Sequence, residues 1–260
     1  MPLILQLAIF ATVGLLVYLG IYYGVPLLLK RNVPLIIAFF FFLWLPIIPL
    51  LPASILFFAL FEDGEMSVVS IMQRFRLVPI QHRDWLWVAG AVLVTAVADE
   101  ALKPVGQYLA RKRFFAPPDF LPAPFHPLKE FAMPPQEFLG APLRGNWALL
   151  LVFIPLHLLA MFSEEMMWRG YLLPLQEAMF GNWAWVLNGL LWAWLVHALL
   201  KWHLIGMLPG MLAAPLIAQH TQSTWASLLA HGVPNALLWV VLLLGVLGVG
   251  ANAPDAEPPG

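Results

Sequence analysis

An acidic pair followed by an arginine is the first group of residues whose spacing could do chemistry. Residues 163–170 read SEEMMWRG and follow sixteen residues, 147–162, that carry no formal charge. At about 100° per residue, Glu165 and Arg169 lie on one face of a helix and can form an ion pair. Glu164 points about 100° away and lacks that partner, so its carboxylate is available as a general base.

Two further polar groups lie in separate apolar segments downstream. His197 is found in LLWAWLVHALL, and the stretch HGVPN places His231 one helical turn before Asn235, on the same face. A lone histidine in an apolar helix is usually a hydrogen-bonded packing residue. A glutamate, a histidine and a histidine–asparagine pair together supply a base, a second proton-handling group and two potential oxyanion donors. These are the kinds of group that could hydrolyse an amide bond.

The composition indicates that these groups sit in a membrane protein. The chain has 260 residues, of which 62% are hydrophobic and 10% charged, whereas soluble domains carry about 25% charged residues. A net charge of −1 does not indicate a nucleic-acid partner. The absence of cysteine excludes a thiol nucleophile and disulfides. We therefore expect an integral, multi-pass membrane protein in contact with the lipid bilayer, located in the cell membrane if its source is prokaryotic. The sequence leaves the oligomeric state open.

Apolar runs predict an all-α fold, a polytopic transmembrane helical bundle of about seven spans, within a range of six to eight. Prolines 46, 49 and 52 predict a kink in the second run. The runs cover residues 3–29, 34–61, 85 to beyond Asp99 and Glu100, 147–180, 183–200, 204–219 and 224–249.

Proline and charge divide the chain into four parts. Residues 1–110 hold the N-terminal membrane helices, with 62–84, which begin with EDGE, as an interfacial loop or short amphipathic helix. Residues 111–146 are a loop rich in proline and phenylalanine, which cannot be a continuous helix and which we place on the membrane surface. Residues 147–250 form the catalytic helical core, and residues 251–260 a disordered tail.

Three motifs in order resemble those of the CAAX protease and bacteriocin-processing family of intramembrane endopeptidases, which includes the type II CAAX prenyl protease (the Ras-converting endopeptidase). They are EExxxR at 164–169, the histidine at 197, and HxxxN at 231–235, so the resemblance covers about residues 147–240. One position departs from the family pattern, since Ala193 stands where the family commonly has an aromatic residue, four before the histidine. Aromatic packing there is expected to be shifted to a neighbouring tryptophan.

The resemblance implies an intramembrane endopeptidase that hydrolyses a peptide bond near the membrane, in a peptide or membrane-protein substrate. It also implies a role for each motif residue. Glu164 and His197 activate a water molecule, His231 and Asn235 stabilise the oxyanion, and Glu165 and Arg169 support the site structurally.

The resemblance leaves the catalytic type open, because the family has been described both as metalloproteases and as metal-independent glutamate proteases. The helical zinc signature HExxH is absent from the sequence, so we favour a site without a cofactor. If zinc is used, Glu164, His197 and His231 are the residues expected to bind it, with a water in the fourth position.

Two other classes of function compete with proteolysis. A non-catalytic membrane scaffold or immunity protein of the same fold would keep these residues without using them. A small transporter would also bury Glu, His and Arg, but usually shows internal repeats, and none is visible. Of the remaining histidines, His157 lies two turns before Glu164 and is a candidate supporting partner, whereas His203 and His220 are expected at the interface. The tryptophans indicate an interfacial belt and packing, and none is given a role.

Overall fold

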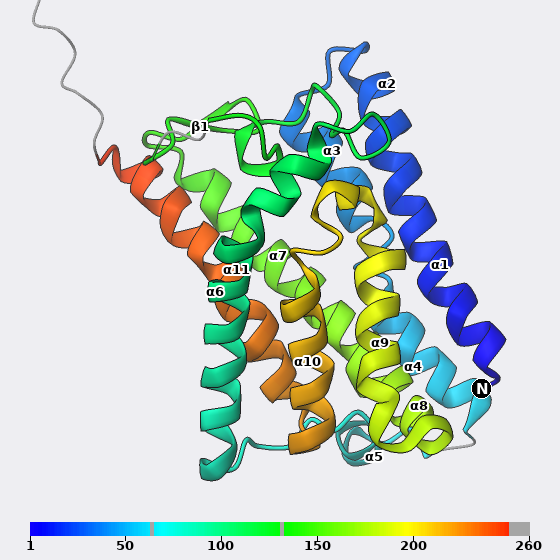
Figure 1. Cartoon of the computed structure of the whole chain (residues 1–260). Coiled ribbons are helices and arrows are strands. Elements are labelled where there is room, and N and C mark those ends of the chain that lie inside the picture. Colours follow the sequence, from blue (N-terminus) through cyan, green and yellow to red (C-terminus); the bar gives the residue numbers. More distant parts are fainter. Residues whose placement is uncertain (63–64, 131–132, 250–260) are drawn as a thin grey trace, which may run out of the picture.

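Helices make up nearly all of the structure, a computed structural model that describes residues 1–62, 65–130 and 133–249. They pack side by side as a bundle (Figure 1), which confirms the predicted all-α class. A two-residue antiparallel pair, β1 (Glu137–Phe138) with β2 (Ala141–Pro142), is the strand structure found in these ranges. The predicted disordered tail, Asp63 and Gly64 of the EDGE stretch and Phe131 lie outside the described residues.

The N-terminal part contains six α-helices. Helix α1 continues through a π-helical turn, η1, into α2, and the proline-containing turn at 45–49 separates α3 from α4, at the position of the predicted kink. Helix α6 continues past Asp99, as expected. The bounds are α1 Leu3–Leu19, η1 Gly20–Gly24, α2 Val25–Leu29, α3 Leu35–Trp44, α4 Leu50–Phe61, α5 Val68–Arg74, η2 His82–Asp84 and α6 Trp85–Ala110.

The C-terminal part carries the three motifs. After α8 the chain reverses at Gly181, whose φ of +54° is a left-handed value that favours glycine. Two segments, η4 and η6, are π-helical, with one extra residue in the turn. The bounds are α7 Trp147–Glu165, η4 Met166–Leu172, α8 Leu173–Phe180, η5 Gly181–Trp183, α9 Ala184–Leu191, η6 Trp192–Val196, η7 Ala198–His203, α10 Leu208–Thr221 and α11 Thr224–Leu247.

Four helical stretches are long and apolar enough to cross a membrane: Leu3–Leu29, His82–Ala110, Trp147–Val196 and Thr224–Leu247. Two shorter apolar helices, α3 and α4, accompany them. The outer surface is correspondingly apolar, with Leu86 81% exposed on α6, and a lipid phase would cover such side chains. These helices indicate a multi-pass membrane protein. The seven predicted spans correspond to four long stretches, one of them reversing at Gly181, and several shorter helices.

The described part of residues 111–146 contains no α-helix. It forms the short 3-10 turn η3 (Ala123–Phe125) and the β1–β2 pair. The prediction that this segment is not a continuous helix is confirmed. It crosses one end of the bundle (Figure 1). Phe114 is 73% exposed, as a surface position requires, but Phe138 is only 1% exposed and packs against Phe40 and Phe153. Phe138 is therefore part of the core, because the β1–β2 turn directs its ring inward, and the placement of the segment on the membrane surface stays a prediction.

Helix α1 packs directly against the segment that precedes the second motif. A Cβ at Gly14 would collide with the carbonyl group of Leu195 in η6, so glycine permits the close backbone approach. The ring of Phe10 stacks on Trp168 at 4.2 Å between centroids, and the hydroxyl of Tyr22 donates to the carbonyl of Leu199 at 3.1 Å. The N-terminal helix thus supports elements that carry the motif residues.

Candidate active site

The acidic pair lies inside the bundle. Glu164 and Glu165 are the last two residues of α7, with 5% and 0% of their surfaces exposed. The π-helical η4 follows at once and carries Arg169, which is also fully buried. Ionised side chains in such surroundings need polar partners, because burial removes their hydration.

Glu165 has three partners. The predicted ion pair with Arg169 forms, with Nη1 3.4 Å from Oε1. In addition, the hydroxyl of Ser227 donates to Oε2 at 2.5 Å, and Nδ1 of His231 lies 3.0 Å from Oε1. Ser227 and His231 both belong to α11. Glu165 therefore joins the first motif to the third, a contact between distant helices that could not be predicted from the sequence.

This bond fixes the orientation of His231. An ionised carboxylate can only accept, so the Nδ1 proton of His231 donates to Glu165 and Nε2 faces away from it. In the neutral ring Nε2 would be an acceptor, and in the imidazolium it would be a donor.

Glu164 is held by two tryptophans instead of a cation. Its Oε1 accepts hydrogen bonds from Nε1 of Trp192 at 2.9 Å and from Nε1 of Trp168 at 3.3 Å. Within the described ranges no Lys, Arg or His forms an ion pair with it, and Oε2 accepts no hydrogen bond. The carboxylate is thus oriented through one oxygen, while the other remains available to a water molecule.

The π-helix η6 accounts for the departure from the family's second motif. The backbone N–H of His197 donates to the carbonyl of Trp192, five residues earlier, at 3.2 Å. The ring of Trp192 meets that of His197 edge-on, with centroids 5.2 Å apart. In an α-helical register Ala193 would occupy this position. The extra residue of the π turn brings Trp192 there instead, so the expected shift of aromatic packing occurs.

Trp192 contacts the other motif residues as well. Its ring is edge-on to His231 at 4.9 Å, and the guanidinium carbon of Arg169 lies 3.7 Å from its centroid. Together with its bond to Glu164 and its contact with His197, this makes Trp192 the side chain that links all three motifs. Treating the tryptophans only as belt and packing residues missed it. The feature of the sequence that could have identified Trp192 is its position next to Ala193, where the family commonly has an aromatic residue.

The second and third motifs leave specific ring and amide atoms free for a ligand. Nδ1 of His197 lies 3.1 Å from the carbonyl of Trp192, which leaves its Nε2 without a bond among the described residues. Nδ2 of Asn235 donates one proton to the carbonyl of His231 at 2.9 Å. Each amide nitrogen carries two protons, so the second remains for another acceptor.

Three of the other histidines have partners of their own. His157 accepts a hydrogen bond from Nε1 of Trp239 at 3.0 Å, so the structure places it in an aromatic cluster and shows no bond to Glu164. His203 pairs with Asp99 at 3.0 Å, and His220 packs on Trp87 with centroids 4.4 Å apart.

Two of the motif histidines have ring nitrogens that a metal ion could use. His197 and His231 each bond through Nδ1 and leave Nε2 free, a pattern found in histidines that bind zinc. However, no group of three His, Asp or Glu side chains is arranged to hold a metal ion in the described part of the chain. The expectation that Glu164, His197 and His231 would bind zinc, if zinc is used, stays a prediction.

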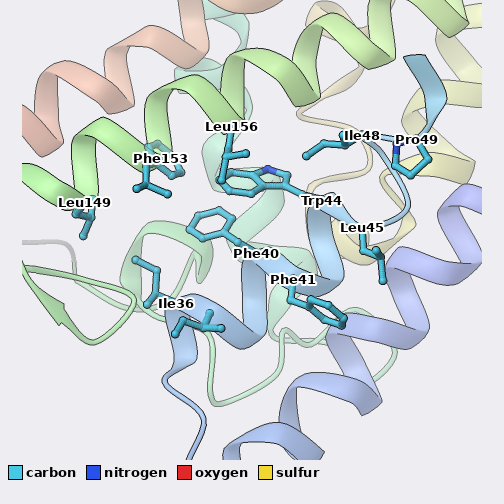
Figure 2. A pocket seen from close by; sticks show the side chains of 12 residues that line it. Ile36, Phe40, Phe41, Trp44, Leu45, Ile48, Pro49, Leu149, Phe153 and Leu156 are labelled. Carbon is cyan, nitrogen blue, oxygen red and sulfur yellow. The ribbon is translucent and has the colours of Figure 1, made fainter. Parts of the chain in front are cut away.

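Two pockets are lined in part by segments that carry or flank motif residues. One, of about 340 Å³, includes His197 in its wall. The other, of about 560 Å³, lies between α3, the turn at 45–49 and the first half of α7, and aliphatic and aromatic side chains face into it (Figure 2). The second pocket contains no group suited to acid–base chemistry, so we assign it no part in the reaction.

The arrangement is that of a multi-pass helical protein with buried acid–base residues on three helical segments. Residues 146–237 match the family model described as Type II CAAX prenyl endopeptidase Rce1-like. The match contains all three motifs and confirms the resemblance, so this segment is an Rce1-like domain of the CAAX protease and bacteriocin-processing family. No curated protein and no solved structure matched the chain.

Proposed function

We propose that the protein is an intramembrane endopeptidase that hydrolyses a peptide bond of a peptide or membrane-protein substrate near the membrane. The observation that carries the proposal is the buried Glu164, oriented by two indole N–H groups through Oε1 and open at Oε2. The Rce1-like family match over residues 146–237 supports the same reaction class.

In the proposed reaction, Glu164 is the general base. Its free Oε2 accepts a proton from a water molecule while the water oxygen bonds to the carbonyl carbon of the scissile peptide. Nε2 of His197 accepts a hydrogen bond from the same water and orients it. When the C–N bond breaks, the proton held by Glu164 passes to the leaving amine. Water is thus divided between the new carboxylate and the new amino group.

His231 and Asn235 stabilise the negative charge that develops on the carbonyl oxygen. Asn235 uses its second amide proton, since the first is donated to the carbonyl of His231. His231 donates through Nε2, while its Nδ1–H donates a hydrogen bond to Glu165. Arg169, Glu165 and Ser227 keep this histidine in place through buried contacts.

Hydrolysis can be detected directly by incubating the purified full-length protein with a mixed peptide library in H₂¹⁸O. We expect new carboxyl termini that carry one ¹⁸O atom, formed by the wild type and absent with Glu164→Ala. A folded wild-type protein that forms no such termini would favour the non-catalytic scaffold. Substrate-dependent ion or solute uptake in vesicles, without cleavage, would favour the transporter.

A further inference from the structure

The pocket that includes His197 borders the proposed reaction centre, and one cation lies in its wall. It has a volume of about 340 Å³, within the range that holds a small ligand or part of a peptide. Elements α1, η6 and η7 and the start of the 111–146 loop form its walls. The lining residues are Tyr18, Phe114, Phe115, Ala193, Trp194, His197, Ala198, Lys201 and Leu204.

Lys201 is the charged residue of this lining, apart from the histidine. Its ammonium lies 4.9 Å from the ring centroid of Tyr22 and 5.5 Å from that of Phe114. Among the described residues it forms no ion pair with a carboxylate. Partial burial lowers the pKa of Lys201 below its usual value, because desolvation penalises the ammonium. Among the described residues, two aromatic rings are the contacts found for this partly dehydrated cation.

We propose that this pocket is a substrate subsite in which Lys201 binds a carboxylate of the peptide, a few residues from the bond that is cleaved. The inference rests on the proposed function, because His197, one of the two residues proposed to activate water, lines the pocket. A bound carboxylate would give the ammonium its missing counter-ion, and the aromatic walls would contact the adjoining side chains. The subsite would select peptides that carry a negative charge on one side of the scissile bond.

A single lysine fits a carboxylate better than a phosphate. Protein sites for phosphate groups usually combine several donors, often with arginine, to match the charge and the three oxygens. This pocket offers one ammonium and mostly apolar walls. The carboxylate can come from an Asp or Glu side chain or from the C-terminus of the peptide chain, and a binding experiment separates these sources.

The test uses binding to the full-length Glu164→Gln protein, so that no peptide is consumed. Short peptides are synthesised as free acids and as amides, each with Glu or Gln at every position in turn, and bound peptides are quantified by mass spectrometry. We expect retention to require a carboxylate. Lys201→Met should weaken that binding about 10- to 100-fold, the range for a hydrogen bond to a charged group, while Lys201→Arg should keep most of it.

Lys112→Met is the matched control, because the Lys112 ammonium also lies over a ring, 4.5 Å from the centroid of Tyr108, but does not line the pocket. Loss of binding on amidation would identify the chain terminus, and loss on changing Glu to Gln would identify a side chain. The proposal would be overturned if acids, amides, Glu peptides and Gln peptides were retained equally, or if no peptide were retained. It would also be overturned if Lys201→Met bound the peptides as tightly as the protein with Lys201. Cleavage by the wild type without charge preference would overturn the subsite alone, whereas charge-selective binding without cleavage would contradict the endopeptidase.

Discussion

Replacing Trp192 with phenylalanine tests whether an indole N–H positions the proposed base. The substitution removes the 2.9 Å hydrogen bond to Oε1 of Glu164 but keeps an aromatic ring beside His197 and under Arg169. Trp168 continues to donate to the same oxygen at 3.3 Å. The carboxylate then has one weaker donor and greater rotational freedom.

The size of the effect follows from the bond that is lost. A hydrogen bond to a charged group contributes about 1.5–3 kcal/mol, and about 1.4 kcal/mol corresponds to a tenfold change in rate. If this bond is needed to hold Glu164 in its reactive orientation, Trp192→Phe should lower kcat about 10- to 100-fold. KM should change little, because Trp192 does not line the pocket next to His197.

The assay is steady-state cleavage of a peptide by protein in detergent, with thermal unfolding measured in parallel. Trp239→Phe is the matched control, since it removes a 3.0 Å indole hydrogen bond to His157, which is not one of the proposed reacting groups. Replacing the Trp192 indole by its benzothienyl analogue, which lacks the N–H but keeps the shape, separates hydrogen bonding from packing. Full activity of that analogue would refute the positioning role, and an equal loss in Trp239→Phe would show that the effect is not specific.

Three other perturbations address stability, the oxyanion and metal. Arg169→Ala leaves the buried Glu165 carboxylate without its cation, so we expect the free energy of unfolding to fall by about 3–5 kcal/mol. The loss would be seen as a lower Tm in detergent, together with lost activity. A normal Tm with lost activity would mean that Arg169 contacts substrate. Asn235→Ala should reduce kcat about 10²–10³-fold with little change in KM, and an effect on KM alone would contradict an oxyanion donor. Chelator washing should leave activity intact and no stoichiometric zinc by elemental analysis. One zinc per chain, lost in His231→Ala, with activity that follows its removal and return, would overturn the metal-free preference.

Much of the fold and part of the candidate site could be predicted from local patterns in the sequence. Hydropathy and length predicted the all-α membrane bundle, and proline placed the break between α3 and α4. The four-residue spacing of Glu165 and Arg169 predicted their ion pair, which the structure shows at 3.4 Å. These features depend on residues close in the chain, where helical geometry fixes the outcome.

Contacts between segments far apart in the chain could not be predicted from the sequence. The bonds from Ser227 and His231 to Glu165 depend on how α11 crosses α7, and nothing in the local pattern encodes that crossing. Similarly, a π turn changes the residue that faces His197 from Ala193 to Trp192, and apolar sequences do not distinguish a π turn from an α turn. A single hydrophobic span can therefore be located correctly while the partner of its key residue is missed.

Glu164→Gln asks whether the Glu164 carboxylate activates water. The glutamine oxygen can still accept from both indole N–H groups, so the fold should be retained, but the amide cannot take a proton from water. We predict the wild-type Tm and no peptide cleavage above background over a complete time course. Cleavage at the wild-type rate by folded Glu164→Gln protein would contradict the account.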